Sequence, residues 1–306
     1  MKEKKIANLL IIGVFKGGTT SLFKYLADHP DICGSSKKET HYFSPLVYLN
    51  GEMEPISTYR EYFKNCTETK YRLEATPSYL YGNSRIIKAL DQTLADNYRL
   101  IVLLRNPTDR FISYYHYIKS RFLIEENMSF EDFVHECKKQ DDLSKSMRVG
   151  HYKNAFKEGM YAQFLIPWIK KFPKSRLKIV FFDDLIQKPQ NMVFNIAKWL
   201  DIDENYYNSY DFSIQNKTVM PDNKYFHKVA VKMNMLLSNF WRKNEYLKTN
   251  LREFYYYLNS SKRGKESISQ ATKVELNLFF KPHNNELRET LLDFNSDIDL
   301  PLWLEK

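Results

Sequence analysis

Four hydrophobic runs in the first two thirds of the chain predict buried β-strands. Each run is rich in Ile, Val and Leu, and polar or turn residues bound it on both sides. Continuous apolar runs of this length are typical of parallel strands that are covered on both faces of a sheet. The predicted strands are Asn8–Val14, Tyr71–Ala75, Leu100–Arg105 and Leu177–Phe182.

Helical patterns of apolar residues fill the stretches between these runs. Strands that alternate with helices indicate an α/β fold, with a central parallel β-sheet, flanking helices and right-handed crossovers. The predicted helices are Thr20–Ala27, Arg85–Ala95, Thr108–Arg121, Ser129–Lys138, Tyr161–Phe172 and Asn191–Leu200.

After about Tyr210 the pattern changes to helices alone. Asn223–Arg263 is helical, basic and aromatic, and Lys273–Leu292 forms a further helix. Because no linker rich in Pro, Gly or Ser separates these helices from the strands, we expect one domain over residues 1–306. Its core would cover about residues 8–220 and its helical extension about 223–306, although a small subdomain is the alternative.

Composition indicates a globular protein with a basic surface. Of 306 residues, 43% are apolar, the formal net charge is +9 and the isoelectric point is about 9.1. Such a surface suits nucleic acid, anionic lipid, a polyanionic sugar or an anionic cofactor. A solvated basic surface without a specific partner explains the charge equally well.

The cysteines and the N-terminus predict a cytoplasmic protein. Cys33, Cys66 and Cys137 are odd in number and far apart, so neither a zinc site nor a disulfide framework is indicated. We expect thiols that pack in the core of a protein from a reducing compartment. The apolar stretch Ile6–Phe15 is too short to span a bilayer and lacks a signal-peptide cleavage site.

The first chemical signal is a glycine-rich turn that follows the first strand and opens a helix. Such a turn directs backbone N–H groups and the positive end of the helix dipole at one point, which suits an anion. Glycines allow close approach of the backbone, hydroxyls add donors and a lysine adds charge. These residues are Lys16, Gly17, Gly18, Thr19, Thr20 and Ser21.

This turn does not match the Walker A loop of kinases and ATPases. In that loop, Lys directly precedes the Ser or Thr that holds Mg²⁺. Here Lys16 precedes the two glycines, and no set of Mg²⁺ ligands is evident. A kinase of related fold is therefore disfavoured. The purely structural alternative is a tight strand–helix turn with an exposed lysine.

The second signal follows the strand that ends at Arg105. Pro107 then starts a helix that carries Arg110 and Ser113 on nearly the same face. Ligands bind at the carboxyl edge of parallel sheets, so Arg105 and Ser113 can converge on a second phosphate. The structural alternative is a helix-cap pair between an arginine and Asp109.

Together, the two motifs resemble those of the sulfotransferase family that uses 3′-phosphoadenosine-5′-phosphosulfate (PAPS). Val14–Leu22 is similar to its 5′-phosphosulfate loop, and Arg105–Tyr115 to its R-x-P-x-x-R-x-x-S-x-Y motif. Other segments resemble the branch of heparan sulfate and related glycan sulfotransferases and their bacterial relatives. These segments are His29–Ile32, Lys38–Phe43, Leu73–Leu80, Gly159–Tyr161, Phe182–Leu185, Asn216–Thr218 with Pro221, and Asp299–Trp303.

The resemblance, which covers about Asn8 to Trp303, implies a P-loop nucleotide-kinase-like fold, PAPS as donor and no required metal. Adenosine 3′,5′-bisphosphate (PAP) would be the product. By position, Lys16 would contact the bridging oxygen and sulfuryl group. The implied ligands of the 5′-phosphate are Gly17, Gly18, Thr19, Thr20 and Ser21, those of the 3′-phosphate are Arg105 and Ser113, and Asn216 and Lys217 would lie in a closing loop.

Two departures from the heparan enzymes point to a bacterial-type member. Ala75 stands where those enzymes often carry a lysine that helps to bind the sulfuryl group, and the disulfide loop that some carry after Asn-Lys-Thr is absent. The acceptor would be a saccharide or glycoconjugate, with a non-sugar small molecule as the alternative. Transfer to a hydroxyl and to an amine both remain open.

The general base is Glu39 or His41. Glu39 matches the motif position of the glycan branch, whereas His is the base of cytosolic small-molecule sulfotransferases and titrates nearer neutrality. Either residue could instead be structural, Glu39 by pairing with Lys37 or Lys38 and His41 by packing beside its aromatic neighbours.

Two further features have ordinary structural explanations. Glu74 could form a buried salt bridge with Arg72 or Arg105. The basic aromatic stretch Phe240–Tyr257 could bind RNA or an anionic membrane, pack on the core, or line the acceptor cleft. We favour packing, expect no nucleic-acid partner and leave peripheral membrane contact open; the sequence does not determine the oligomeric state.

Overall fold

The computed structural model of the protein describes residues 6–48, 51–94, 97–125, 127–139, 151–213 and 267–305, together with residues 229, 230, 233, 237 and 251. Most of the predicted segment Asn223–Arg263, including nearly all of Phe240–Tyr257, lies outside these residues. So do Asn216 and Lys217.

The centre of the fold is a five-stranded parallel sheet with the strand order β2-β3-β1-β4-β5. The four predicted strands are confirmed to within a residue or two at each end. The strand β2 was missed because it is only three residues long. The strands are β1 (Leu9–Gly13), β2 (Ile32–Gly34), β3 (Tyr71–Ala75), β4 (Arg99–Leu104) and β5 (Leu177–Phe181).

Both faces of the sheet are buried, which explains its unbroken apolar runs. Successive side chains of a strand point to opposite faces, so Leu10 and Ile12 lie in one hydrophobic core and Leu9 and Ile11 in the other. Every residue of β1 is buried. A polar residue at alternate positions would therefore have no face that meets water.

Helices cover the two faces in pairs. α1 (Thr19–Ala27) and α10 (Pro189–Leu200) supply side chains to one core, and α4 (Asn83–Thr93) and α8 (Tyr161–Lys171) to the other. All six helices predicted between the strands are confirmed. The remaining helices are α2 (Pro45–Tyr48), α3 (Ile56–Glu61), α5 (Pro107–Ser120), α6 (Phe130–Lys138), α7 (His151–Lys157), α9 (Phe182–Gln187) and α14 (Gln270–Phe294), with 3-10 turns η1 (Pro77–Gly82), η2 (Glu204–Ser209) and η3 (Leu302–Leu304).

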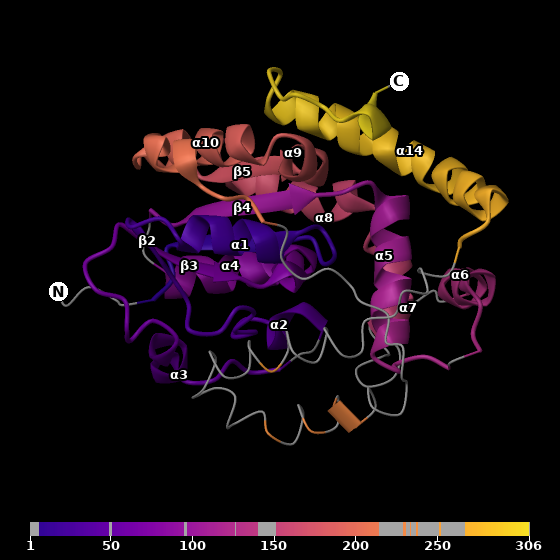
Figure 1. Ribbon diagram of the computed structural model, residues 1–306, viewed down its shortest axis with the longest axis horizontal. Helices are drawn as coiled ribbons and strands as arrows, with labels where there is room; N and C mark the ends of the chain where they lie inside the picture. The colour runs from indigo at the N-terminus through magenta and orange to yellow at the C-terminus, as the bar shows by residue number, and fades with distance from the viewer. Residues whose placement is uncertain are drawn as a thin grey trace.

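The C-terminal helix α14 packs along the side of the molecule from α6 to the region of α9 (Figure 1). Leu276 and Phe280 join a third core made with α5, α6 and α7, whereas Leu287 and Leu291 join the core beneath α8. The predicted helix over residues 273–292 is thus confirmed. Within the described part of the chain, no helix has both the length and the apolarity needed to cross a membrane.

A disulfide between Cys33 and Cys66 corrects the prediction of unpaired thiols. The Cα atoms lie 5.7 Å apart, although the residues are separated by 33 positions in the sequence. Cys33 lies on β2, and Cys66 follows α3 on the way to β3, the strand next to β2. Disulfides persist mainly in oxidising compartments, so the thiol argument for a cytoplasmic location no longer holds.

Reduction of this disulfide should destabilise the protein. A cross-link that closes a loop of this length stabilises a fold by about 3–4 kcal/mol through the unfolded chain. We expect dithiothreitol to lower the Tm by roughly 5–10 °C, measured by calorimetry. A Cys33→Ala/Cys66→Ala variant should melt at the lower temperature with or without reductant; a variant that still responds to reductant would contradict this assignment.

Candidate active site

The turn after β1 is held so closely that two of its positions require glycine. The Val14 amide donates to the Leu103 carbonyl of β4 at 2.9 Å, and the Gly17 amide donates to the Val14 carbonyl at 2.9 Å. A Cβ atom on Gly17 would lie 2.8 Å from that same Leu103 oxygen. Gly18 has φ +93°, in the left-handed region that favours glycine, and forms the N-cap of α1.

The first turn of α1 remains available to an anion. The N-cap residue of α1, Gly18, has no side chain with which to cap the helix, and Thr19 and Ser21 are buried just inside it. The N-terminus of α5 differs, because the Asn106 side chain accepts the Thr108 amide at 2.9 Å and the Asp109 amide at 3.3 Å. The helix dipole and the amides of α1 therefore offer the anion site that the glycine motif predicts.

Lys16 and Arg105 meet at the carboxyl edge of the sheet. Nη1 of Arg105 donates to the Lys16 carbonyl at 3.0 Å, which joins the turn after β1 to the end of β4. The Lys16 ammonium lies 4.6 Å from the centroid of the Tyr117 ring on α5. In Figure 1 the arrow of β4 points toward α5, which stands at this edge. Two cations predicted from separate motifs are thus neighbours.

Arg105 has an unmet donor that suits an anionic ligand. Its guanidinium lies 4.2 Å from the centroid of the Phe182 ring, and its Nε is buried without a hydrogen-bond partner among the described residues. Burial lowers the pKa of Arg105 from its usual value. Tyr161 donates to the Arg105 carbonyl at 2.8 Å. Ser113, in the second turn of α5, is half-buried.

Arg110 has a structural place, different from the cap pair that we considered with Asp109. Its side chain is fully buried, lies 3.7 Å from the Glu158 carboxylate and donates to the Ala155 carbonyl. Asp109 is exposed on the first turn of α5. Arg110 therefore joins α5 to the end of α7 inside the third core, whereas the charge of Asp109 acts on Arg105 and raises its pKa against the effect of burial.

The loop that follows β2 brings Glu39 to the end of β3. The Glu39 amide donates to the Ala75 carbonyl at 3.0 Å, and the Thr76 amide donates to Ile11 of β1 at 3.1 Å. The Glu39 carboxylate lies 2.7 Å from the Lys38 ammonium and 3.7 Å from Nε2 of His41. Both candidate bases therefore sit together beside the strand that leads into the phosphate loop.

Three of the five described non-glycine residues with positive φ are the candidate catalytic residues. Lys16 has φ 63°, Glu39 has φ 61° and His41 has φ 58°. The left-handed conformation costs about 1–2 kcal/mol per residue with a side chain, and such strain concentrates at functional sites. This backbone feature is independent of the motifs, so it supports the same three positions separately.

The surroundings of His41 favour the neutral imidazole. Neighbouring atoms reduce its hydration, which lowers the pKa of His41 below its ordinary value of 6.5; the Glu39 charge raises this pKa, and Lys37 and Lys38 lower it. Nδ1 of His41 lies 3.0 Å from the Ser44 hydroxyl. A neutral ring at neutral pH can accept a proton, so His41 remains a chemically competent rival to Glu39.

Glu74 forms neither of the salt bridges that we considered. It is fully buried and accepts hydrogen bonds from the hydroxyls of Thr40, Tyr59, Thr76 and Tyr79. The Arg72 Nε instead donates to the Ile6 carbonyl at 2.8 Å. Arg105 is directed toward Lys16 and Phe182.

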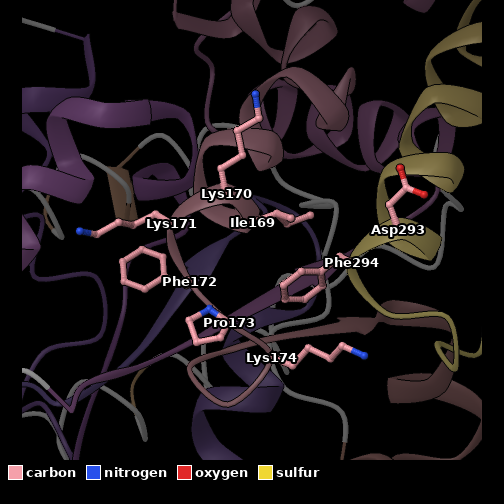
Figure 2. A pocket seen from close by; sticks show the side chains of 8 residues that line it. All are labelled: Ile169, Lys170, Lys171, Phe172, Pro173, Lys174, Asp293 and Phe294. Carbon is pink, nitrogen blue, oxygen red and sulfur yellow. The ribbon is translucent and has the colours of Figure 1, made fainter.

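An open groove of about 610 Å³ lies elsewhere, between the C-terminal ends of α8 and α14 (Figure 2). Its lysines do not converge: Lys171 pairs with Asp91 at 2.7 Å, and Lys174 donates to Asn295 at 2.9 Å. Its residues Phe172, Pro173 and Lys174 lie just before β5 in the chain, so the groove borders the amino end of that strand. The groove is therefore separate from the site at the carboxyl edge.

Comparison with known proteins agrees with this geometry. A family model described as "Sulfotransferase domain" matches residues 7–262. The chain belongs to the sulfotransferase domain family. A solved sulfotransferase from Alicyclobacillus acidocaldarius has the same fold, with a TM-score of 0.66 and 20% sequence identity over 98% of this chain and 99% of that one. The P-loop-like sulfotransferase fold is thereby confirmed.

Curated relatives are similar over part of their length. A membrane-associated sulfotransferase, kil1, of Dictyostelium discoideum is 37% identical over 162 residues, which cover 50% of this chain and 32% of that protein. Heparan sulfate glucosamine 3-O-sulfotransferase 3A1 of Mus musculus is 28% identical over 200 residues, or 65% and 47% of the two chains. The match to these relatives thus spans half of their length or less.

Sequence reasoning assigned no site role to three aromatic residues near Lys16 and Arg105, although Tyr161 and Phe182 lie in segments that resemble the family. Phe182 lies under Arg105, Tyr117 under Lys16, and Tyr161 donates to the Arg105 carbonyl. Phe182 directly follows a strand, so the strand-end rule could have identified it. Tyr117 lies four residues after Ser113, on the same helical face. No sequence signal marked Tyr161 as a partner of Arg105.

Gly18→Ala should weaken PAP binding and also destabilise the sulfotransferase. The new methyl would lie 2.7 Å from Leu185 Cδ2 and 2.9 Å from Phe182 Cδ2, in a conformation that L-residues rarely adopt. We expect a destabilisation of about 1–3 kcal/mol and a PAP affinity reduced at least about tenfold, measured by calorimetry. Lys24→Ala, on the exposed face of α1, is the control; equal affinity in both variants would refute the anion site.

Glu39→Gln should lower the pKa of His41 further. The substitution removes the negative charge, 3.7 Å from Nε2, that raises this pKa. Lys38→Gln should raise the same pKa, because it removes a positive charge. Both directions can be measured by NMR titration of the imidazole, and a pKa of His41 that does not respond to either variant would contradict the pairing seen here.

Proposed function

We propose that this protein transfers a sulfuryl group from PAPS to a hydroxyl or amine of a saccharide or glycoconjugate. The proposal is carried by two features at the same edge of the sheet. The N-terminus of α1 has no side-chain cap, and the Nε of Arg105 lacks a partner among the described residues. One offers an anion site at the glycine turn and the other at the end of β4. A donor with separate 5′ and 3′ phosphates needs two such sites.

Donor binding is assigned to residues of both motifs. Backbone amides and hydroxyls of Gly17, Gly18, Thr19, Thr20 and Ser21 would hold the 5′-phosphate. Arg105 and Ser113 would hold the 3′-phosphate, which distinguishes PAPS from ATP. Asn216 and Lys217 remain candidates for a closing loop, although they lie outside the described residues. The position of Lys16 before the glycines makes a kinase the weaker alternative.

Sulfuryl transfer resembles phosphoryl transfer, so catalysis is mostly positioning and electrostatics. PAPS would supply the sulfuryl group, and PAP would leave. Lys16 stabilises the negative charge that develops on the leaving phosphate oxygen. Glu39 accepts the proton of the acceptor hydroxyl or amine as the new S–O or S–N bond forms; His41 is the rival base. No step in this scheme requires a metal.

The acceptor class is inferred from the relatives and from local charge. Relatives named as heparan sulfate 3-O- and N-sulfotransferases favour a saccharide, with a hydroxyl or an amine as the acceptor group. Lys37 and Lys38 directly precede Glu39 and act on the charge of His41, and cations there suit an anionic acceptor. A non-sugar small molecule remains the alternative.

Domain organisation and location are also proposals. We infer a single domain, because Leu287 and Leu291 of α14 lie in the same core as Trp168 of α8 and Leu10 of β1. A bacterial-type origin is supported by Ala75 alone among the described residues. A cytoplasmic location stays a prediction, against which the disulfide counts.

PAP should stabilise the protein selectively. A ligand at a hundredfold its Kd stabilises a fold by about 2.7 kcal/mol, which raises the Tm by a few degrees in a protein of this size. We expect this shift with PAP, a smaller one with AMP, and none with ATP–Mg²⁺. Arg105→Ala should abolish the shift, whereas Arg60→Ala, an exposed arginine on α3, should keep it.

Stabilisation by ATP–Mg²⁺ instead of PAP would overturn the proposal in favour of a kinase. Where PAP binds, radiolabelled PAPS with partly desulfated heparan sulfate as acceptor tests the transfer itself. Glu39→Gln should then abolish transfer without loss of the PAP shift. Transfer that persists in Glu39→Gln but not in His41→Gln would reassign the base.

A further inference from the structure

The candidate bases Glu39 and His41 depend on a loop whose conformation needs support. Both have positive φ, and Thr40 lies between them. Thr40 is almost completely buried, although its neighbours on both sides reach solvent. A left-handed residue on each side of a buried one persists only where surrounding groups hold it. The group that holds Thr40 is therefore important for the placement of both bases.

The Glu74 carboxylate is that group. The Thr40 hydroxyl donates to Oε1 of Glu74, which also accepts from Thr76 at 2.9 Å and from Tyr79 at 2.8 Å. Oε2 accepts from the Tyr59 hydroxyl of α3. An ionised carboxylate has about four acceptor positions, and here four hydroxyls donate to it, three to Oε1 and one to Oε2. None of the four partners is a cation.

The same hydroxyls extend the network along the loop. The Tyr42 amide donates to Thr40 Oγ1 at 3.3 Å, and the Phe43 amide donates to the Tyr79 hydroxyl at 3.2 Å. The Glu39 amide donates to the carbonyl of Ala75, the residue directly after Glu74. The Glu74 network thus reaches both ends of the loop over residues 39–43, while the Glu74 carboxylate itself is fully buried.

We propose that Glu74 is a positioning residue, which places Glu39 and His41 for proton transfer by holding Thr40. This inference rests on the proposed sulfotransferase activity. Burial raises the pKa of the Glu74 carboxyl above its ordinary value, and the four hydroxyls offset this rise only in part. The four hydroxyl donors are held in place around the Glu74 carboxylate by the fold. Loss of the bond between Thr40 and Glu74 should therefore loosen the loop of Glu39 and leave the phosphate turn intact.

Thr40→Val tests the proposal, because it removes the hydroxyl with little change of shape. We expect kcat for transfer from PAPS to partly desulfated heparan sulfate to fall at least about tenfold. The KM for PAPS and the affinity for PAP should stay within about twofold, because a kcat effect alone reports on the transition state. With PAP bound to both proteins, the amides of residues 39–43 should exchange faster in Thr40→Val than in the wild type. The amides of residues 17–22 should exchange at the same rate in both.

Matched variants separate positioning from general destabilisation. Thr40→Ser keeps the hydroxyl and should restore the slow exchange and most of kcat. Thr69→Val removes a buried hydroxyl that has no partner among the described residues, and should leave both unchanged. Glu74→Gln, which places an amide donor against hydroxyl donors, should act like Thr40→Val; if it fails to fold, Thr40→Val decides the question.

The outcomes are distinguishable. Failure of the wild-type protein to bind PAP would remove the proposed function and this inference together. A wild-type protein that binds PAP, with unchanged exchange of residues 39–43 in Thr40→Val, would overturn the inference alone. So would a Thr40→Val variant that loses PAP affinity and kcat in parallel, since that result indicates general damage to the fold. If partly desulfated heparan sulfate is not an acceptor, the exchange measurement still decides.

Discussion

The parallel arrangement of the strands is the constraint on which the site depends. With every strand running the same way, the turns after β1, β3 and β4 all emerge at one edge. This edge carries Lys16, Arg105 and the loop of Glu39. Cover on both faces favours apolar strands, and the polar exceptions on β3, Arg72 and Glu74, make hydrogen bonds inside the protein. Chemistry is confined to the turns, where backbone amides and helix ends are available.

Backbone hydrogen bonds join these turns into one unit. The Val14 amide and the Arg105 side chain tie the phosphate turn to β4. The Glu39 amide ties its loop to the end of β3, and the Thr76 amide ties the end of β3 to β1. Each bond uses a main-chain group that would otherwise be buried without a partner. The site is therefore positioned mainly by main-chain groups at the carboxyl edge of the sheet.

Two buried ionisable side chains of this protein, Arg110 and Glu74, have partners of different kinds. Arg110 has an acidic partner, Glu158, and a backbone carbonyl, as buried charges usually do. Glu74 has four hydroxyl donors instead. Arg110 joins two helices of the third core, and Glu74 joins the loop of Thr40, α3 and η1. The polar groups of the interior thus connect the elements that surround the site.

The sequence by itself determined the α/β class, four of the five strands, the helices between them and the two phosphate motifs. These features are local: apolar periodicity and glycine-rich turns depend on neighbours a few residues away. The tertiary structure alone decided the Cys33–Cys66 disulfide, the network of Glu74, the partner of Arg110 and the aromatic rings beneath Lys16 and Arg105. Each joins segments that are distant in sequence, and a hydroxyl, thiol or ring can satisfy many partners. Only the folded chain selects which one lies within reach.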